Sequence, residues 1–249
     1  MKDKYRVIYA PKGPALEYSP LALNLYVGCS HGCKYCYAPS CMFKKREEYG
    51  KEENIYIRDG ILDKLQKDLI EMSMLKDRRR VLLCFITDPY QGEYSFNKIT
   101  SEALALFKAY NIPFQVLTKG GMKAARDFYL YKKGDAYATT LTFYDEKKSE
   151  EWEPMAANPK ERIKSLRKAK EKGIETWVSF EPVIDPKETY KLFEASKEVV
   201  DLYKIGKINN YKQIDKNVDW REFTHNIINL CEKNNKEYYI KESLQPYIS

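Results

Sequence analysis

The sequence predicts an α/β fold, a partial parallel (β/α)6 barrel, built from all 249 residues. Short, almost continuously apolar segments alternate along the chain with longer segments of helical periodicity, and six such pairs are present. Strands that are apolar on both faces are typical of parallel sheets covered by helices. No linker, repeat or low-complexity segment interrupts the pattern, so we expect a single domain over residues 1–249, in which residues 1–20 form a lead-in arm.

The predicted strands are short apolar segments bounded by polar, glycine or proline residues. They cover residues 21–27, 81–87, 114–119, 135–143, 175–183 and 202–208, and residues 238–241 would add a last short strand. The predicted helices carry apolar residues three and four positions apart. They cover residues 55–74, 98–110, 159–172, 187–199 and 219–235, and one more begins at Met122. Residues 38–54 are mostly charged and are expected to form a long loop or a short helical excursion, and a long acidic loop precedes residue 159.

Charge and hydropathy exclude few classes of protein. The chain has 43 basic and 36 acidic residues and a net charge of +7, a mild excess that permits a nucleic-acid substrate without requiring one. The arginines at 78–80 and the basic helix 160–172 are candidate phosphate contacts. That helix has an apolar inward face, however, so its charges are most simply its solvated side. No apolar run is long enough to span a bilayer, and the first residues lack the apolar core of a signal peptide, so we expect no membrane contact.

Three cysteines lie within eight residues directly after the first predicted strand. Cys29, Cys33 and Cys36 have the spacing C-x3-C-x2-C, which is too tight for unstrained disulfides but suits convergence on one metal centre. Cysteine thiolates are the usual ligands of iron–sulfur clusters, and three local ligands leave the fourth iron of a cubane open. A zinc site that adds His31 is the alternative, although structural zinc sites usually draw ligand pairs from two separate segments. A chance cluster of unligated thiols is the third interpretation, and we assign His31 to shaping the loop.

The residues around these cysteines follow the pattern N-x-Y-x-G-C-x-H-x-C-x-Y-C-Y-A over positions 24–38. This pattern resembles the signature of radical S-adenosylmethionine (radical SAM) enzymes, and in particular of the spore photoproduct lyase-like group, which is related to DNA repair photolyases. The resemblance implies a partial barrel of the radical SAM type, a [4Fe-4S] cluster on Cys29, Cys33 and Cys36, and S-adenosylmethionine at the open iron. It also implies reductive cleavage of that cofactor to a 5′-deoxyadenosyl radical that abstracts hydrogen, and an external one-electron reductant of the flavodoxin or ferredoxin type. Free cysteines beside an oxygen-sensitive cluster suit a reducing cytoplasm.

Polar residues end four of the predicted strands, and the carboxyl ends of barrel strands carry the chemistry in such folds. They are Thr87 and Asp88, Lys119, Thr140 and Thr142, and Ser179 and Glu181. The resemblance implies that Thr87 and Asp88 hold the amino group of the methionine moiety, and that Lys119 lies near its carboxylate.

The remaining assignments that the resemblance implies concern the rest of the cofactor and the substrate. Thr140 or Thr142, which strand alternation would place on one face, would bond the ribose or the carboxylate. Tyr35 and Tyr37 match aromatic positions near the adenosyl group. Glu181 and Ser179 would line the substrate side.

The chain departs from the lyases where substrate chemistry is concerned. Phe85 stands at the position of their hydrogen-donor cysteine, and Cys84 is one residue away. If Thr87 points into the barrel, alternation places Phe85 and Val81 inside and Cys84 outside, as a small buried hydrophobe. The longer region that precedes the motif in the DNA-repairing lyases is also absent from these residues. The resemblance therefore supports the class of chemistry but not the DNA lesion.

Two other functions stay open, namely a radical modifier of RNA, a nucleotide or a peptide, and a non-catalytic zinc- or cluster-binding module. The remaining cysteines and the second histidine look structural. We expect Cys41 to be a free loop thiol, because a fourth thiolate would occupy the iron that the cofactor needs. Cys231 is expected in the core side of the last helix and His225 on its surface.

Overall fold

The computed structural model describes residues 4–42, 45–92, 94–209 and 211–248. Seven strands form one sheet in the order β1-β4-β5-β6-β7-β8-β9, and every neighbouring pair is parallel. The strands are β1 (Leu21–Leu23), β4 (Val81–Leu83), β5 (Phe114–Thr118), β6 (Ala136–Thr140), β7 (Glu175–Val183), β8 (Leu202–Lys207) and β9 (Glu237–Ile240). Among the described residues no ladder joins β1 to β9, so the barrel is open. The predicted partial parallel barrel is confirmed, with the last short strand as its seventh member.

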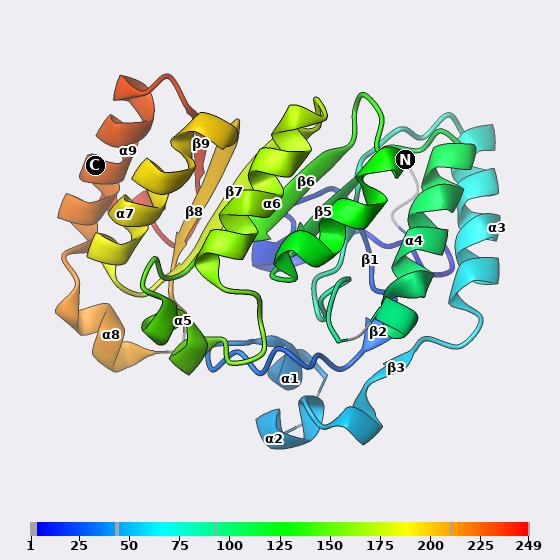
Figure 1. The fold of residues 1–249 in the computed structure, drawn as a ribbon, viewed down its shortest axis with the longest axis horizontal. Coiled ribbons are helices and arrows are strands. Elements are labelled where there is room, and N and C mark those ends of the chain that lie inside the picture. The colour runs from blue at the N-terminus through cyan, green and yellow to red at the C-terminus, as the bar shows by residue number, and fades with distance from the viewer. Residues whose placement is uncertain (1–3, 43–44, 93, 210, 249) are drawn as a thin grey trace.

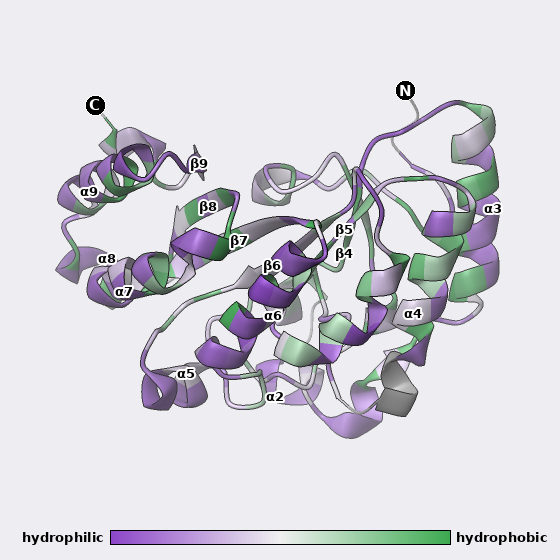
Figure 2. Cartoon of the chain, turned by 45° about the horizontal axis from the view of Figure 1, so that its top comes forward, coloured by the Kyte–Doolittle hydropathy of each residue, from purple (hydrophilic) through white to green (hydrophobic). Residues whose placement is uncertain are grey.

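Helices connect successive strands and cover one side of the sheet (Figure 1). They are α3 (Ile61–Met74), α4 (Tyr94–Ala109), η3 (Gly121–Leu130), α6 (Pro159–Glu171), α7 (Pro186–Ser196) with η4 (Lys197–Val199), and α9 (Trp220–Lys233). Asn158, Asp185 and Asp219 start three of them, because each side chain accepts a hydrogen bond from a backbone N–H of the first turn. Hydrophilic residues line the outer surfaces of α6 and α7 (Figure 2). Within the described residues, none of the helices combines the length and the apolar character needed to cross a bilayer.

The two faces of the sheet are packed differently. Val116, Tyr137 and Val178 point toward the helices and belong to the main hydrophobic core. Ala136 and Ala138 point the other way, into the interior of the open barrel, because successive side chains of a strand alternate between faces. We call this interior the lumen. Ala136 and Ala138 pack there with Leu82 and Trp177.

The lead-in arm is part of the barrel. The carboxylate of Asp68 on α3 accepts hydrogen bonds from the backbone N–H groups of residues 6–8, at 2.9, 2.7 and 3.0 Å. Tyr9 then pairs with β1 in an antiparallel bridge. After a short η1 turn (Gly13–Ala15), Tyr18 enters the lumen, where its ring centroid lies 5.8 Å from that of Trp177.

The first predicted strand is wrong as a single element. Residues 21–27 form β1 and, after a break, β2 (Tyr26–Val27), which pairs antiparallel with β3 (Tyr56–Ile57). Asn24 lies in the break, and its side-chain oxygen accepts from the backbone N–H groups of Phe85 and Ile86, at 2.9 and 3.1 Å. A buried side-chain amide thus takes over the hydrogen bonds that a longer strand would make.

The predicted strand 81–87 also ends early, at Leu83. Val81 packs on the helix side and Leu82 faces the lumen, so the prediction that Val81 points inward is wrong. The extended backbone stops before Cys84. The alternation of side chains between the two faces therefore cannot be counted back from Thr87 to Val81. Cys84 is buried on the helix side and Phe85 packs on the lumen side, as predicted.

Several loop predictions also need correction. The helix predicted from residue 55 begins at Ile61, because β3 and Gly60, with a left-handed φ of 59°, precede it. The helix expected from Met122 is the 3-10 helix η3. The acidic loop before residue 159 contains α5 (Glu146–Trp152), and α8 (Lys212–Asn217) was not anticipated. Within residues 38–54 the chain forms α1 (Ala38–Cys41), α2 (Arg46–Tyr49) and η2 (Glu52–Asn54), and η5 (Gln245–Tyr247) follows the last strand.

Candidate active site

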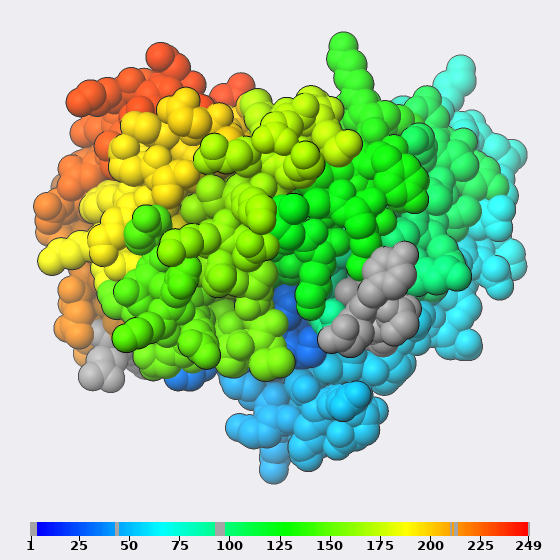
Figure 3. All heavy atoms as spheres, viewed as in Figure 1, coloured from blue at the N-terminus to red at the C-terminus, as the bar shows by residue number. Residues whose placement is uncertain are grey.

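The loop that carries the three cysteines, residues 28–37, lies at the end of the barrel where the strands end. We call it the cysteine loop. The backbone N–H of Lys34 donates to the carbonyl of Trp152 at 2.9 Å, and Met155 donates to His31 at 3.2 Å, so the segment after β6 is bound to it. α1 and α2 continue from the loop and project from the same end of the molecule (Figures 1 and 3).

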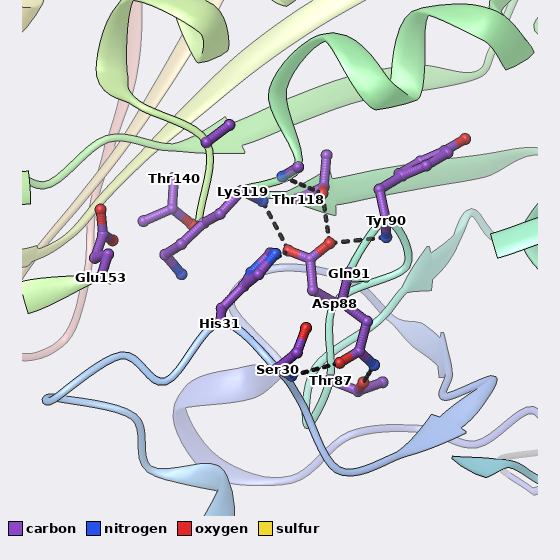
Figure 4. Close-up of polar contacts among 12 residues, drawn as sticks. Ser30, His31, Thr87, Asp88, Tyr90, Gln91, Thr118, Lys119, Thr140 and Glu153 are labelled. Carbon is purple, nitrogen blue, oxygen red and sulfur yellow. Dashed lines mark hydrogen bonds and ion pairs between the residues drawn. The ribbon is translucent and has the colours of Figure 1, made fainter. Parts of the chain in front are cut away.

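Two residues that follow β4 hold the start of this loop through hydrogen bonds. The hydroxyl of Thr87 donates to the carbonyl of Gly28 at 2.6 Å, and the Gln91 amide donates to the same carbonyl at 3.1 Å. The Gln91 oxygen accepts from the backbone N–H of Ser30 at 2.6 Å (Figure 4). Gly28 has a φ of +76°, and a Cβ there would lie 2.7 Å from the carbonyl oxygen of Asn54, so only glycine fits.

The thiols of the loop are placed between solvent and the strand ends. Cys33 is buried, at 8% exposure, whereas Cys29 and Cys36 are partly exposed. Burial raises the pKa of the Cys33 thiol to about 12, and Lys119 opposes this shift. Burial, followed by the charges of Asp88 and Cys33, raises the pKa of Cys29. Thiols in such surroundings become thiolates by binding a metal rather than by simple titration.

The four candidate ligands of the zinc alternative are not arranged around one ion. Within the described ranges, no three His, Cys, Asp or Glu side chains converge as ligands of a single metal ion do. The His31 ring instead faces Asp88, with Nδ1 at 3.5 Å from the carboxylate. Burial lowers the pKa of His31, which favours the neutral ring. His31 is therefore held as part of the loop, as predicted.

The carboxylate of Asp88 organises the ends of β4 and β5. It accepts hydrogen bonds from the backbone N–H of Tyr90 at 2.8 Å, the Thr118 hydroxyl at 2.6 Å and the backbone N–H of Lys119 at 2.7 Å (Figure 4). With His31 beside it, both carboxylate oxygens are already engaged. The roles of Asp88 and Thr87 toward an amino group stay predictions, while the contacts present make both residues internal anchors.

The side chain of Lys119 is placed differently. It extends away from Asp88 toward Thr140 and Glu153 (Figure 4), and its ammonium lies 5.5 Å from the centroid of the Tyr35 ring. In the described part of the chain its nitrogen has no hydrogen-bond or ion-pair partner. Burial acts to lower the pKa of Lys119, but the nearby Cys33 and Glu153 outweigh it, and the pKa is raised. A partly buried ammonium that stays charged suits an anionic ligand.

A buried ion pair that the sequence analysis missed supports this region. Glu153 and Arg162 are each 1% exposed, and Arg162 Nη2 lies 2.7 Å from the Glu153 carboxylate. Arg162 also donates to the carbonyl of Thr140 at 3.0 Å and to that of Ala157 at 2.6 Å. The prediction that the charges of this helix are all solvated is wrong at Arg162. Its position next to the inward Ile163 was the one available signal.

The predicted aromatic and threonine residues separate into two groups. The hydroxyls of Tyr35 and Thr142 both bond to Glu153, the latter at 3.3 Å, and they lie 3.2 Å from each other. Tyr37 is 49% exposed and donates to the carbonyl of Phe85 at 3.0 Å. Thr140 ends β6 on the lumen face, and its hydroxyl has no hydrogen bond within the described residues. Thr142 lies beyond the strand, so alternation does not relate it to Thr140.

The predicted substrate side, near Ser179 and Glu181, is occupied by other parts of the chain. The Tyr18 hydroxyl donates to Glu181 at 2.5 Å and lies 2.7 Å from Ser179. Lys241 forms ion pairs with Glu181 and, at 3.3 Å, with Glu17. These polar groups are therefore held in internal contacts with the arm and the segment after β9.

The basic residues considered as phosphate contacts lie elsewhere. Arg79 pairs with Asp77 and Arg80 with Glu175, both at 2.7 Å, at the ends where β4 and β7 begin. That end of the sheet is opposite the cysteine loop. Cys84 and Cys231 are buried in the helix-side core, Cys41 is exposed on α1, and His225 is exposed on α9, as predicted.

Comparisons with known proteins agree with this arrangement. The family model of the Radical SAM superfamily matches residues 23–200. An uncharacterised protein of Methanocaldococcus jannaschii is 26% identical over 176 residues, which are 70% of this chain and 62% of that protein. The match thus spans less than two thirds of this curated relative.

Two groups of solved structures share the fold. A variant of spore photoproduct lyase superposes with a TM-score of 0.69 at 13% identity, covering 93% of this chain and 78% of the lyase. SuiB of Streptococcus suis bound to S-adenosylmethionine superposes with a TM-score of 0.61 at 12% identity, covering 88% and 45%. Other structures of the two proteins hold a dinucleoside spore photoproduct and the precursor peptide SuiA.

The family model covers most of the chain, from the end of β1 through η4, and includes the cysteine loop and every rim residue discussed above. Proteins of this superfamily use a [4Fe-4S] cluster and S-adenosylmethionine, and these are the cofactors that the cysteine loop and the strand ends would receive. The chain belongs to the radical SAM superfamily.

Proposed function

We propose that Cys29, Cys33 and Cys36 bind the [4Fe-4S] cluster and that S-adenosylmethionine binds at its fourth iron, over the ends of β4–β6. When bound and reduced, the two cofactors supply a 5′-deoxyadenosyl radical that abstracts a hydrogen atom from the substrate. The partly buried ammonium of Lys119, charged, near Cys33 and 5.5 Å from the Tyr35 ring centroid, is the observation that carries this proposal. The exposed position of Cys41 supports leaving the fourth iron to the cofactor.

The residues of the chain would orient the cofactor and keep water from it. Lys119 would bind the methionine carboxylate, because a charged hydrogen bond is strong in a partly dry site. Thr140, with an uncommitted hydroxyl on the same rim, would bond the ribose, and Tyr35 and Tyr37 would flank the adenosyl group. Thr87 would hold the cysteine loop and Asp88 the end of β5, and both would also contact the amino group of the methionine moiety. Glu181 would shape the lumen beyond.

For the reaction, we propose a spore photoproduct lyase-like hydrogen abstraction on an organic substrate other than a thymine lesion. Phe85 packs in the lumen where the lyases carry a thiol, and Cys84 lies on the helix side of the sheet. Radical modification of RNA, a nucleotide or a peptide is the second candidate, and the superposition on SuiB favours including peptides. An external one-electron carrier of the flavodoxin or ferredoxin type would supply the electron.

Anaerobic reconstitution tests the proposal. The protein should bind about four irons per chain, by the stoichiometry of a cubane cluster. With dithionite and S-adenosylmethionine it should slowly form 5′-deoxyadenosine, and an added substrate should accelerate this. DNA duplexes, RNA, nucleotides and peptides would be compared as substrates. Zinc in place of iron and sulfide, or no cleavage of the cofactor, would refute the proposal.

A further inference from the structure

One side chain outside the predicted site donates two hydrogen bonds to the cysteine loop. Arg46, the first residue of α2, donates from Nη1 to the carbonyl of Cys33 at 2.8 Å and from Nη2 to the carbonyl of Cys36 at 3.0 Å. The two arms of one guanidinium thus span the two nearest cysteines. The side chain of Arg46 is exposed, and the partly buried ammonium of Lys119 lies near Cys33 on the side of the strand ends. Arg46 thus holds the loop from outside, and Lys119 places a second positive charge near Cys33.

We propose that Arg46 is a positioning residue that fixes the Cys33–Cys36 segment around the cluster and raises the reduction potential of the cluster. This inference rests on the proposed function, in which those cysteines are cluster ligands. Arg46 binds backbone carbonyls and touches no reacting atom.

The geometry requires arginine. The guanidinium is planar and rigid, so its two arms can bond two carbonyls at once, whereas an ammonium binds as a single point. It also brings a positive charge to the loop. A fixed positive charge next to the ligand backbone stabilises the reduced cluster, which carries one more electron, more than the oxidised cluster. Glu47 and Glu48 bring negative charges to the same short helix. That of Glu48 is offset by Lys51, whose ammonium lies 2.6 Å from its carboxylate.

Two substitutions separate holding the loop from tuning the potential. Arg46→Gln removes the charge, and Arg46→Lys keeps the charge but loses the two-armed contact. Lys45→Gln, at the preceding exposed position, removes the same charge without this contact and serves as the control. Each variant would be reconstituted and titrated with redox mediators under electron paramagnetic resonance, and its rate of iron loss to a chelator would be measured.

We expect Arg46→Gln to shift the midpoint to a more negative potential, with roughly a tenfold lower ratio of reduced to oxidised cluster, or about 59 mV for one electron. Arg46→Lys should keep a midpoint near the wild-type value and lose iron several-fold faster, and Lys45→Gln should change neither quantity. An unchanged midpoint in Arg46→Gln, or an equal shift in Lys45→Gln, would overturn the inference. Failure of the wild-type protein to bind iron and sulfide would instead refute the proposed function.

Discussion

The lumen has two sides that use charge in opposite ways. On the β4–β6 side, Lys119 holds a partly buried charge without a hydrogen-bond or ion-pair partner among the described residues. On the β7–β9 side, Lys241 is paired with Glu17 and Glu181, and Tyr18 adds its own hydrogen bond. Buried charges left unpaired are costly, whereas paired ones hold structure together. The difference supports the proposal that the first side receives a ligand, whereas the second is closed by the protein itself.

Lys204 shows the same closure deeper in the lumen. Its ammonium donates to the carbonyls of Glu17 and Tyr18, at 2.9 and 3.0 Å, and lies 5.1 Å from the Trp177 ring centroid. Burial, followed by the charge of Lys241, lowers the pKa of Lys204 to about 8. The arm thus fills this part of the lumen with its own backbone.

The largest expected effect concerns the cysteine loop. Replacing Cys29, Cys33 and Cys36 together by alanine should abolish cluster binding, because no thiolate of the loop remains. Iron and sulfide analysis after anaerobic reconstitution measures this. Cys41→Ala is the matched control and should bind the normal amount of iron. Equal loss in the control would mean that the cluster has a fourth protein ligand, and the β4–β6 side would then not be prepared for S-adenosylmethionine.

The next largest effect concerns the support below Lys119. Arg162→Met leaves Glu153 buried without its cation and should lower the free energy of unfolding by about 3–5 kcal/mol. Pairing with Arg162 holds the pKa of Glu153 below its ordinary value of 4.5 against the effect of burial. The stability that ionised Glu153 contributes is therefore present above about pH 4.5. It is lost as the pH falls through the lower pKa that Glu153 has in the folded state.

Chemical unfolding of Arg162→Met and of the double variant Glu153→Gln/Arg162→Met, at several pH values, measures this effect. The loss caused by Arg162→Met should shrink in acid, where Glu153 can be protonated, and the double variant should recover part of the stability. A loss that does not change with pH would show that Arg162 acts through packing alone.

The third effect in size is on the affinity for S-adenosylmethionine, and it compares the two sides of the lumen directly. Lys119→Ala should weaken binding of S-adenosylmethionine roughly ten- to a hundredfold, the range for loss of one charged hydrogen bond, and leave iron content unchanged. Lys123→Ala removes a nearby exposed lysine that bonds the carbonyl of Gly92, and it should leave affinity unchanged. Equilibrium binding to the reconstituted protein measures both. Unaltered affinity in Lys119→Ala would make this lysine an ordinary strand-end residue.

The smallest effect is expected on the closed side. Tyr18→Phe removes the hydrogen bonds of this hydroxyl to Glu181 and Ser179. Glu181 keeps its ion pair with Lys241, so we expect a loss of about 1–2 kcal/mol in unfolding free energy. Affinity for S-adenosylmethionine should not change. If affinity fell as far as in Lys119→Ala, the two sides of the lumen would act as one site and the comparison would fail.

Much of the fold followed from local pattern. Each strand predicted between residues 114 and 208 is a short apolar run between polar residues. The predicted bounds agree with those of β5 and β8 to within one or two residues, and the strand predicted at 135–143 extends further than β6. The errors cluster where a distant side chain replaces a strand neighbour. Asn24 ends β4 early by bonding Phe85 and Ile86 across some sixty positions, and no local pattern reports such a bond.

The sequence by itself determined the family and the three candidate cluster cysteines, because ligands proposed within one short loop can be recognised from adjacent residues. It also determined that polar residues gather at the strand ends, since parallel strands must end at one edge. Only the tertiary structure decided how these residues are used. Asp88 and Thr87 are hydrogen-bonded within the chain, Lys119 has no such partner among the described residues, and Glu153, just after α5, pairs with Arg162 of α6. Those outcomes depend on which groups burial brings together, and burial is a property of the packed chain.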